Sequence, residues 1–255
     1  MFLIFYRWVL CISLKKTSYN NLYYDLLEEA IMAIPSGSSK YTPYLSYDCP
    51  ELNFWAHQYG EKISYNKNQI ILTAETIVDS VYYIEQGRVR YVTISAEGDE
   101  HILGILGDDS FFGLVPVLLS DHTCEVLVIS EAATIVYKID KDCFIRILNM
   151  NTELNLSIIK ALAHFGNELI YQIENLLFFD SEERLLNLLY ASIDKNISSD
   201  QDWYRLKIQY TQEDIGKIIG VSRITVTRII SELCKRKIIR LINHKIEVKR
   251  TPNTK

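Results

Sequence analysis

Hydrophobic positions between residues 61 and 140 fall in short runs that alternate with polar turns. The runs are rich in β-branched and aromatic residues, and the turns contain glycine and acidic residues, a pattern typical of strands. Six strands are predicted: Gln69–Leu72, Val81–Ile84, Arg88–Ile94, His101–Ile105, Glu125–Ile129 and Thr134–Ile139. Their spacing predicts a jelly-roll-like barrel, or β-roll. A small barrel of this kind has a mouth or lumen where a ligand can bind, although many such barrels are simply packed.

A helical pattern follows from Glu153 to Leu177. Its apolar residues recur at steps of four, three and four, with a glutamine at one core position: Ile158, Leu162, Phe165, Leu169, Gln172 and Leu176. This is heptad spacing, so we expect the helix to pair with a second copy of itself in a parallel homodimer. The alternative is that the same stripe packs on the chain's own β-roll.

Two shorter helices are predicted between Tyr210 and Glu232, joined at Gly220. Thr211 can cap the first helix in a capping box with Asp214, and Ser222 can cap the second. Apolar stripes at helical spacing give each helix a buried face: Ile215, Ile218 and Ile219 in the first, and Val226, Ile229, Ile230 and Leu233 in the second. This pattern is typical of a helix-turn-helix, although two helices joined at a glycine also occur in ordinary bundles.

The outward face of the second helix carries residues suited to reading DNA, because the first turns of such a helix enter the major groove. An arginine there can form a bidentate pair with guanine, while Ile224 and the methyl group of Thr227 can touch thymine methyl groups. The residues expected to contact DNA from this segment are Thr211, Ser222, Arg223, Ile224, Thr227 and Arg228.

Apolar runs at Ile238–Ile242 and Ile246–Val248 flank the polar turn Asn243–Lys245, which predicts a hairpin. A basic hairpin behind a reading helix makes the unit a winged helix-turn-helix, with Lys245 at the tip of the wing near the phosphate backbone. The alternative for Lys245 is a solvated turn lysine.

The charge is divided unevenly along the chain, which contains 27 Lys and Arg and 32 Asp and Glu. Residues 205–255 contain thirteen basic and four acidic residues, whereas residues 1–204 contain fourteen and twenty-eight. A basic terminal domain is favoured by counterion release from phosphates, and an acidic body discourages binding elsewhere. The division therefore supports double-stranded DNA as a partner.

Asp180–Glu183 can open a further helix with a capping box, and Phe178–Phe179 form the expected hinge before it. An α+β fold follows, with a cupin-like β-roll, a long dimerisation helix and a C-terminal winged helix-turn-helix. The expected divisions are an N-terminal extension at 1–44, the effector-sensing β-roll at 45–150, the dimerisation helix and hinge at 151–179, and the DNA-binding domain at 180–255.

These features resemble the Crp/Fnr superfamily of transcription regulators over about residues 45–250. The most specific match is the motif T-Q-E-D-I-G-x-x-x-G-V-S-R-x-T-V-x-R at Thr211–Arg228, with further matches at Gly107–Gly113, the long helix and the F-F-D hinge. The resemblance implies a roll that senses a signal, a helix that dimerises, a winged helix-turn-helix that binds a palindromic promoter site, and RNA polymerase as a partner. It implies a regulator and not an enzyme.

The chain departs from the family's cyclic-nucleotide branch in the segment that binds the nucleotide. The glutamate that contacts the ribose is replaced by Leu114, and the Arg-Ser or Arg-Thr pair that contacts the phosphate falls on Cys124 and Glu125. The hydroxyl pair that contacts adenine falls on Leu169 and Ile170. A carboxylate where a phosphate should dock is repulsive, so cyclic AMP is expected to be excluded.

We expect the effector to bind between the roll and the long helix in a mostly apolar cavity, as suits a small aromatic or hydrophobic molecule. The predicted lining residues are Phe112, Gly113, Leu114 and Cys124 of the roll and Phe165, Glu168, Leu169 and Tyr171 of the helix. The alternative is a filled hydrophobic core at the same place.

No cofactor or metal is expected. The five cysteines, Cys11, Cys49, Cys124, Cys143 and Cys234, are scattered and include no C-x-x-C, which disfavours an iron-sulfur cluster or structural zinc. A thiol switch at Cys124 is possible, but buried structural cysteines are commoner.

The dispersed histidines give little support to a cupin-type enzyme, and a small-molecule-binding module without a DNA role is disfavoured by the charge division. The absence of a paired-cysteine framework fits the cytoplasm.

Two further features bear on specificity and on the start of the chain. Ile224 stands where many family members carry a glutamate that accepts from cytosine, so we expect a preference for an A·T pair there. In this respect the helix is similar to that of halorespiration regulators.

Met1–Leu14 is apolar but too short to span a bilayer. It is expected to be an extra packing helix or the product of an upstream start, with Met32 as the ordinary start.

Overall fold

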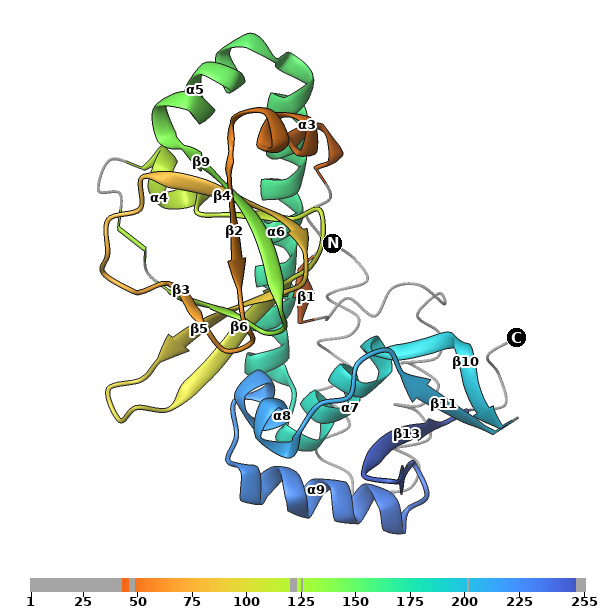
Figure 1. Ribbon diagram of the computed structural model, residues 1–255. Helices are drawn as coiled ribbons and strands as arrows, with labels where there is room; N and C mark the ends of the chain where they lie inside the picture. Colours follow the sequence, from red (N-terminus) through yellow and green to blue (C-terminus); the bar gives the residue numbers. More distant parts are fainter. Residues whose placement is uncertain (1–42, 46–48, 120–122, 125, 201, 251–255) are drawn as a thin grey trace, which may run out of the picture. The chain divides into compact units, whose positions relative to one another are not determined.

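A computed structural model describes residues 43–45, 49–119, 123–124, 126–200 and 202–250 (Figure 1). Residues 1–42 of the predicted N-terminal extension and Glu125 lie outside these ranges, whereas Tyr44, assigned to the extension, belongs to a strand of the roll. The described residues up to Lys249 pack as one compact unit. Among the described helices, none is long and apolar enough to cross a membrane.

The first half of the described chain forms the β-roll. Its elements are β1 (Tyr44–Leu45), α3 (Pro50–Tyr59), β2 (Glu61–Tyr65), β3 (Ile70–Leu72), β4 (Ser80–Gln86), β5 (Val89–Ile94), β6 (Glu100–Leu106), β7 (Phe111–Phe112), α4 (Leu114–Leu118), β8 (Leu127–Ser130), β9 (Thr134–Asp140) and α5 (Lys141–Met150). All six predicted strands are confirmed, with shifts of one or two residues at their ends. The prediction missed α3, β2 and the short elements β1, β7, α4 and α5.

The roll consists of two sheets, with strand orders β1-β6-β5-β8-β3 and β2-β9-β4-β7. Its core is filled by apolar and aromatic side chains from both sheets and from α3 and α5, including Leu52, Tyr83, Phe112, Val136 and Phe144. The first sheet carries apolar residues on its outer face as well, on either side of Arg90. There Tyr44, Ile105, Arg90 and Ile129 are aligned across β1, β6, β5 and β8.

The second half contains the long helix α6 and, from α7 onwards, the predicted DNA-binding domain, which we call the reader. Its elements are α6 (Thr152–Phe178), α7 (Ser181–Ala191), β10 (Ile193–Asp200), β11 (Trp203–Leu206), α8 (Gln212–Ile219), α9 (Arg223–Lys235), β12 (Ile239–Ile242) and β13 (Lys245–Lys249). The predicted hairpin is β12–β13, which belongs to a sheet of order β10-β11-β13-β12. The strands β10 and β11 were not predicted.

The long helix α6 starts at the predicted place because Asn151 caps it, its side chain accepting from the backbone N–H of Leu154 at 2.9 Å. Leu154, Ile158 and Ala161 are buried in the roll core, and α6 runs beside the roll in Figure 1. Two residues of the predicted dimer seam face the chain's own roll, because Ile158 is only 4% exposed and Phe165 packs at the edge of the same core, whereas Leu162 and Leu176 are exposed. Gln172 of that seam donates to the carbonyl of Leu103 on β6. Part of this face therefore packs on the chain's own roll, which was the alternative to a dimer seam.

A different stripe of α6 is exposed along the whole helix. It contains Leu156, Ile159, Ala163, Gly166, Ile170, Ile173 and Leu177, at alternating steps of three and four residues. This is heptad spacing, displaced from the predicted seam. We call these seven residues the outer seam.

Candidate DNA-reading surface and effector site

The turn between α8 and α9 has the geometry predicted from its caps. The Thr211 hydroxyl accepts from the backbone N–H of Asp214 at 3.1 Å, and the Asp214 carboxylate accepts in return from the Thr211 N–H. Gly220 ends α8 in the left-handed region with φ of 69°. A Cβ at Gly216 would lie 2.6 Å from the carbonyl oxygen of Val221, so this helical position needs glycine for the chain to pass close by.

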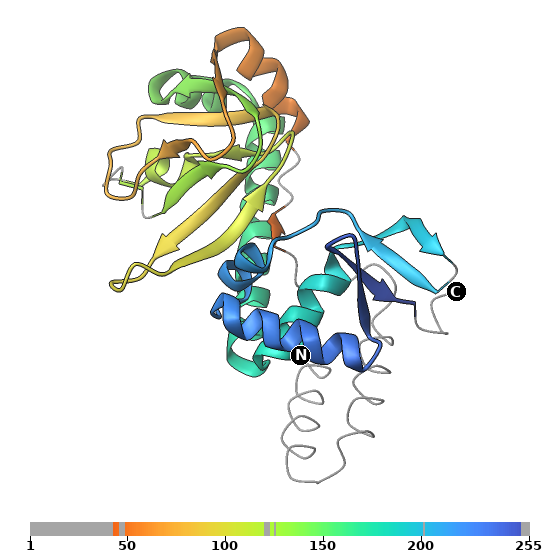
Figure 2. The same ribbon diagram turned by 60° about the horizontal axis from the view of Figure 1, so that its bottom comes forward.

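The recognition helix α9 has the predicted division between its faces. Val226, Ile229, Ile230 and Leu233 are buried in the reader core. The four predicted reading residues, Arg223, Ile224, Thr227 and Arg228, are all exposed. Ile224 is 82% exposed, which is unusual for an isoleucine in a helix that otherwise packs well. In Figure 2, α9 lies at the surface of the reader.

Hydroxyl groups near this face are engaged inside the protein. Thr227 donates to the side chain of Gln212 at 2.7 Å and to the carbonyl of Arg223, so its methyl group remains for a base. The hydroxyls of Thr211 and Ser222 are occupied by their capping bonds, to Asp214 and Thr225 respectively. These two residues therefore position the helices.

The wing is held by a buried carboxylate that the sequence analysis missed. Glu247 on β13 is 3% exposed and pairs with Arg240 at 2.7 Å and Arg205 at 3.3 Å. Arg240 also lies 4.5 Å above the ring of Trp203. Asn243 and His244 both have positive φ, the conformation of a two-residue hairpin turn, and this places the exposed Lys245 next to the tip. An acidic residue between two apolar ones in a basic hairpin was the available signal for Glu247.

Four of the eight predicted effector residues come together in a packed core. Phe112 stacks on Tyr82 with a ring separation of 4.8 Å. Leu114 and Cys124 are buried in the same cluster, and Phe165 packs against it. The Cys124 thiol donates to the carbonyl of Val126 at 3.0 Å.

The other four predicted residues differ in their surroundings. Gly113 has a φ of 82°, and an added Cβ would lie 2.6 Å from the backbone oxygen of Ser80, so the backbone, rather than an open pocket, surrounds it. Leu169 and Tyr171 are half-buried. One carboxylate oxygen of Glu168 is buried and has no hydrogen-bond partner in the described part of the chain. Burial raises the pKa of Glu168, and His164 partly opposes this shift.

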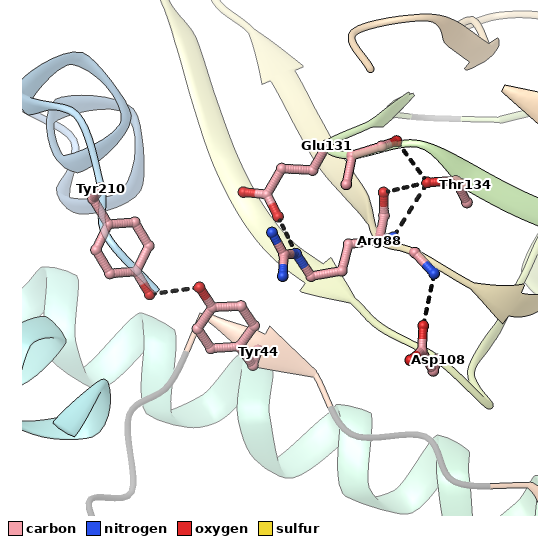
Figure 3. Close-up of polar contacts among 8 residues, drawn as sticks. Tyr44, Arg88, Asp108, Glu131, Thr134 and Tyr210 are labelled. Carbon is pink, nitrogen blue, oxygen red and sulfur yellow. Dashed lines mark hydrogen bonds and ion pairs between the residues drawn. The ribbon is translucent and has the colours of Figure 1, made fainter. Parts of the chain in front are cut away.

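Two hollows lie away from the predicted effector residues. One, of about 480 Å³, is open and is bordered by Gly87, Arg88 and Asp108. Two polar groups at its edge are paired within the protein: Arg88 lies 2.9 Å from Glu131 (Figure 3), and the Gly87 N–H donates to Asp108 at 2.7 Å. The other, of about 10 Å³ between β6 and α6, has room for a single water. Within the described ranges, no group of three His, Cys, Asp or Glu side chains is placed to hold a metal.

Comparison with known proteins matches each half of the chain to a family model. Residues 62–151 match the cyclic nucleotide-binding domain, and residues 183–252 match the Crp-like helix-turn-helix domain. The cAMP-activated global transcriptional regulator CRP of Salmonella typhimurium is 27% identical over 156 residues, covering 61% of this chain and 73% of that protein. The global nitrogen regulator of a Nostoc species is 24% identical over 189 residues, covering 72% and 83%.

Solved structures share the fold at lower identity. A CooA mutant from Carboxydothermus hydrogenoformans has a TM-score of 0.67 at 21% identity, covering 82% of this chain and 95% of that one. The c-di-GMP responsive regulator CLP of Xanthomonas campestris has a TM-score of 0.66 at 16% identity, covering 80% and 100%. CprK complexed with OCPA has a TM-score of 0.65 at 18% identity, covering 81% and 92%.

A sensing roll of the cyclic nucleotide-binding type, followed on one chain by a Crp-like reader, defines a DNA-binding transcriptional regulator rather than an enzyme. The chain belongs to the Crp/Fnr family.

Proposed function

We propose that the protein is a homodimeric regulator that binds an inverted repeat in promoter DNA and whose affinity is set by a small-molecule effector other than cyclic AMP. The observation that carries the proposal is the combination of an exposed reading face on α9 with the exposed outer seam of α6. The first supplies sequence readout, and the second supplies a surface that needs a partner. RNA polymerase is the expected further partner, and the cytoplasm is the expected place of action, because the ligand is DNA.

The outer seam supports pairing of two α6 helices. Exposed Leu156, Ile159, Ile170, Ile173 and Leu177 provide its large apolar residues. The middle of the seam is Ala163 and Gly166, and an added Cβ at Gly166 would meet nothing within 4 Å. Small residues in the middle of a seam let two helices approach closely. A parallel pair brings the two readers to the same side of the dimer, related by a twofold axis, as an inverted repeat requires.

Exclusion of cyclic AMP rests on the chemistry of the segment that would hold its phosphate. No lysine or arginine occurs between Gly107 and Ser130. Leu114 is buried in the roll core, and the thiol of Cys124 bonds to the backbone. A cyclic phosphate would be desolvated there without a cation, which is unfavourable. Similar proteins are a cAMP-activated regulator, a c-di-GMP responsive regulator and CprK complexed with OCPA, so the fold is found with more than one kind of small molecule.

The proposed effector is a small aromatic or hydrophobic molecule held between the roll and α6. The residues there are apolar and closely packed, so the effector must displace side chains such as Leu169 or Tyr171 to enter. Glu168 is the polar group best placed for specificity, because its buried carboxylate oxygen has no partner within the described residues. It would accept a hydrogen bond from a hydroxyl or N–H group of the effector.

Titration calorimetry with cyclic AMP and cyclic GMP tests the exclusion. We expect no binding at micromolar concentrations of either nucleotide. Micromolar binding would show that a phosphate is accommodated although residues 107–130 contain no lysine or arginine, and the effector part of the proposal would fall while the DNA-binding part stood.

A further inference from the structure

The first helix of the helix-turn-helix, α8, is attached to the roll of the same chain at both ends. At its N-terminal end, Tyr210 directly precedes the cap residue Thr211. The Tyr210 hydroxyl donates to the hydroxyl of Tyr44 on β1 at 2.7 Å and lies 3.0 Å from that of Ser192 (Figure 3). The two tyrosines are 166 positions apart in the chain.

At the C-terminal end of α8, the contacts are with β6. The ammonium of Lys217 lies 2.9 Å from the carboxylate of Glu100 and 3.0 Å from that of Glu213. The neighbouring His101 hydrogen-bonds to the backbone of Lys217. A Cβ added at Gly220, the end of α8, would lie 3.7 Å from the His101 ring.

Between these two ends, the contact is apolar. Val92, Ile102, Ile105 and Ile129 of the roll belong to the same buried cluster as the core of the reader, which includes Ile218 of α8. These roll residues are at most 6% exposed. A reader that moved away from the roll would uncover them, so the attached arrangement is favoured in the free protein.

We propose that these contacts form a clasp that holds the reader against its own roll in a state of low DNA affinity, and that DNA binding requires the clasp to open. The clasp is defined as the Tyr44–Tyr210 hydrogen bond, the Glu100–Lys217 ion pair and the His101 contact. The proposal depends on the reader binding DNA, and not on the dimer or on the identity of the effector.

The direction of the effect follows from charge. In helix-turn-helix complexes the first helix crosses the phosphate backbone. In the clasp, α8 lies beside the β5–β6 hairpin, whose turn carries the carboxylates of Glu97, Asp99 and Glu100. Phosphates brought near these carboxylates would be repelled, and Lys217, already paired with two carboxylates, cannot offset the repulsion. Weakening the clasp therefore shifts the population towards the state that binds DNA.

Two variants open the clasp from the roll side without touching the reading face. Glu100→Gln removes the ion pair, and Tyr44→Phe removes one hydroxyl while keeping the ring. The matched control is Glu97→Gln, which makes the same charge change on the same hairpin at a carboxylate that is exposed and forms no ion pair within the described residues. The thermal unfolding curve of each variant checks that it is folded.

Two measurements at one fixed pH decide the proposal. Hydrogen exchange of the α8 amides without DNA should become faster in Glu100→Gln and Tyr44→Phe and stay unchanged in Glu97→Gln. Affinity for a mixed-sequence 30-base-pair duplex is measured at constant salt without effector. It should be about threefold to tenfold higher in the clasp variants than in the control, a change typical of coupling between two sites. Equal affinities in Glu100→Gln and Glu97→Gln, or a loss of affinity in the clasp variants, would overturn the proposal. A wild-type protein that binds no duplex at all would instead refute DNA binding itself. The exchange measurement needs no DNA, so unchanged exchange of the α8 amides in Glu100→Gln and Tyr44→Phe would refute the clasp in that case too.

Discussion

Thr227 of the recognition helix donates its hydroxyl to the side chain of Gln212 on the first helix at 2.7 Å. This bond joins α8 to α9 beside the exposed residues Arg223 and Ile224. It therefore fixes the reading face of α9 relative to α8, the helix expected to cross the phosphate backbone of DNA. The same bond engages the hydroxyl of Thr227 within the protein. The face therefore exposes two arginines and two methyl-bearing side chains, which are the residues proposed to read the bases.

Arg228→Ala should cost about 1 to 3 kcal/mol of binding free energy on the preferred site and relax the choice of base at one position. The physical reason is loss of a bidentate pair with a base edge. Lys245→Ala serves as the comparison, because a phosphate contact weakens binding to all sequences alike and lowers the salt slope by about one unit. Binding to a panel of singly mutated sites distinguishes them, and uniform losses for Arg228→Ala would contradict its assignment.

Ile224→Glu should change specificity rather than abolish binding. The side chain is 82% exposed, so a glutamate fits there without disturbing the core. A carboxylate accepts from cytosine N4, whereas isoleucine can only contact a thymine methyl. The variant should therefore favour a G·C pair where the wild type favours A·T. Ile224→Val is the control that keeps the preference, and an unchanged preference in Ile224→Glu would show that residue 224 does not face a base.

Ile170→Glu should convert a dimer into a monomer, because it places a carboxylate in the middle of the outer seam on each helix. Met150→Glu is the control, since Met150 is also apolar and exposed but lies at the end of α5. Sedimentation at micromolar concentration measures the difference. A wild-type monomer, or a dimer that tolerates Ile170→Glu, would show that the two chains meet elsewhere.

Acidification should loosen the clasp through His101. Burial lowers the pKa of this imidazole below its ordinary value of 6.5, with Arg184 on α7 acting in the same direction, while the bond to the backbone of Lys217 on α8 opposes the shift. The attached state therefore favours the neutral ring. The contribution of His101 to the free energy of unfolding is therefore fully present above about pH 6.5. It is lost as the pH falls through the lowered pKa of the imidazole. The melting temperature of the wild type should fall more between pH 7.5 and 5.5 than that of His101→Gln, and parallel decreases would contradict a role for His101.

The helices and the β12–β13 hairpin of the reader could be predicted from the sequence because their signals are local, whereas β10 and β11 were missed. The capping boxes at Thr211 and Asp180, the cap at Ser222 and the glycine at 220 each act within four residues, and all are confirmed. The apolar stripes of α8 and α9 are equally local. The buried Glu247 was missed because its arginine partners come from two different strands.

The long helix shows why its face could not be predicted. Apolar residues occupy two interleaved heptad stripes, one containing Ile158 and the other containing Ile159. Periodicity places each stripe on one face but cannot say which face meets the roll. That is decided by distant contacts such as the bond between Gln172 and the Leu103 carbonyl.

The effector site could be located only approximately. Four of the predicted residues, three from the roll and Phe165 of α6, do lie together, but the sequence could not show that Phe112, Leu114 and Cys124 are closely packed. Nor could it show that Gly113 has a positive φ, which makes any bulky substitution there a test of backbone strain rather than of a cavity. The link between Tyr44 and Tyr210 was equally out of reach, because no local pattern connects residues so far apart in the chain.

Selection of bound duplexes from a random DNA library tests the central claim most directly, because it needs no knowledge of the effector or the promoter. We predict enrichment of an inverted repeat whose half-site centres lie one helical turn apart, about 34 Å. Enrichment of a site without dyad symmetry, or no enrichment with a folded protein, would contradict the claim that two readers of a symmetric dimer bind DNA.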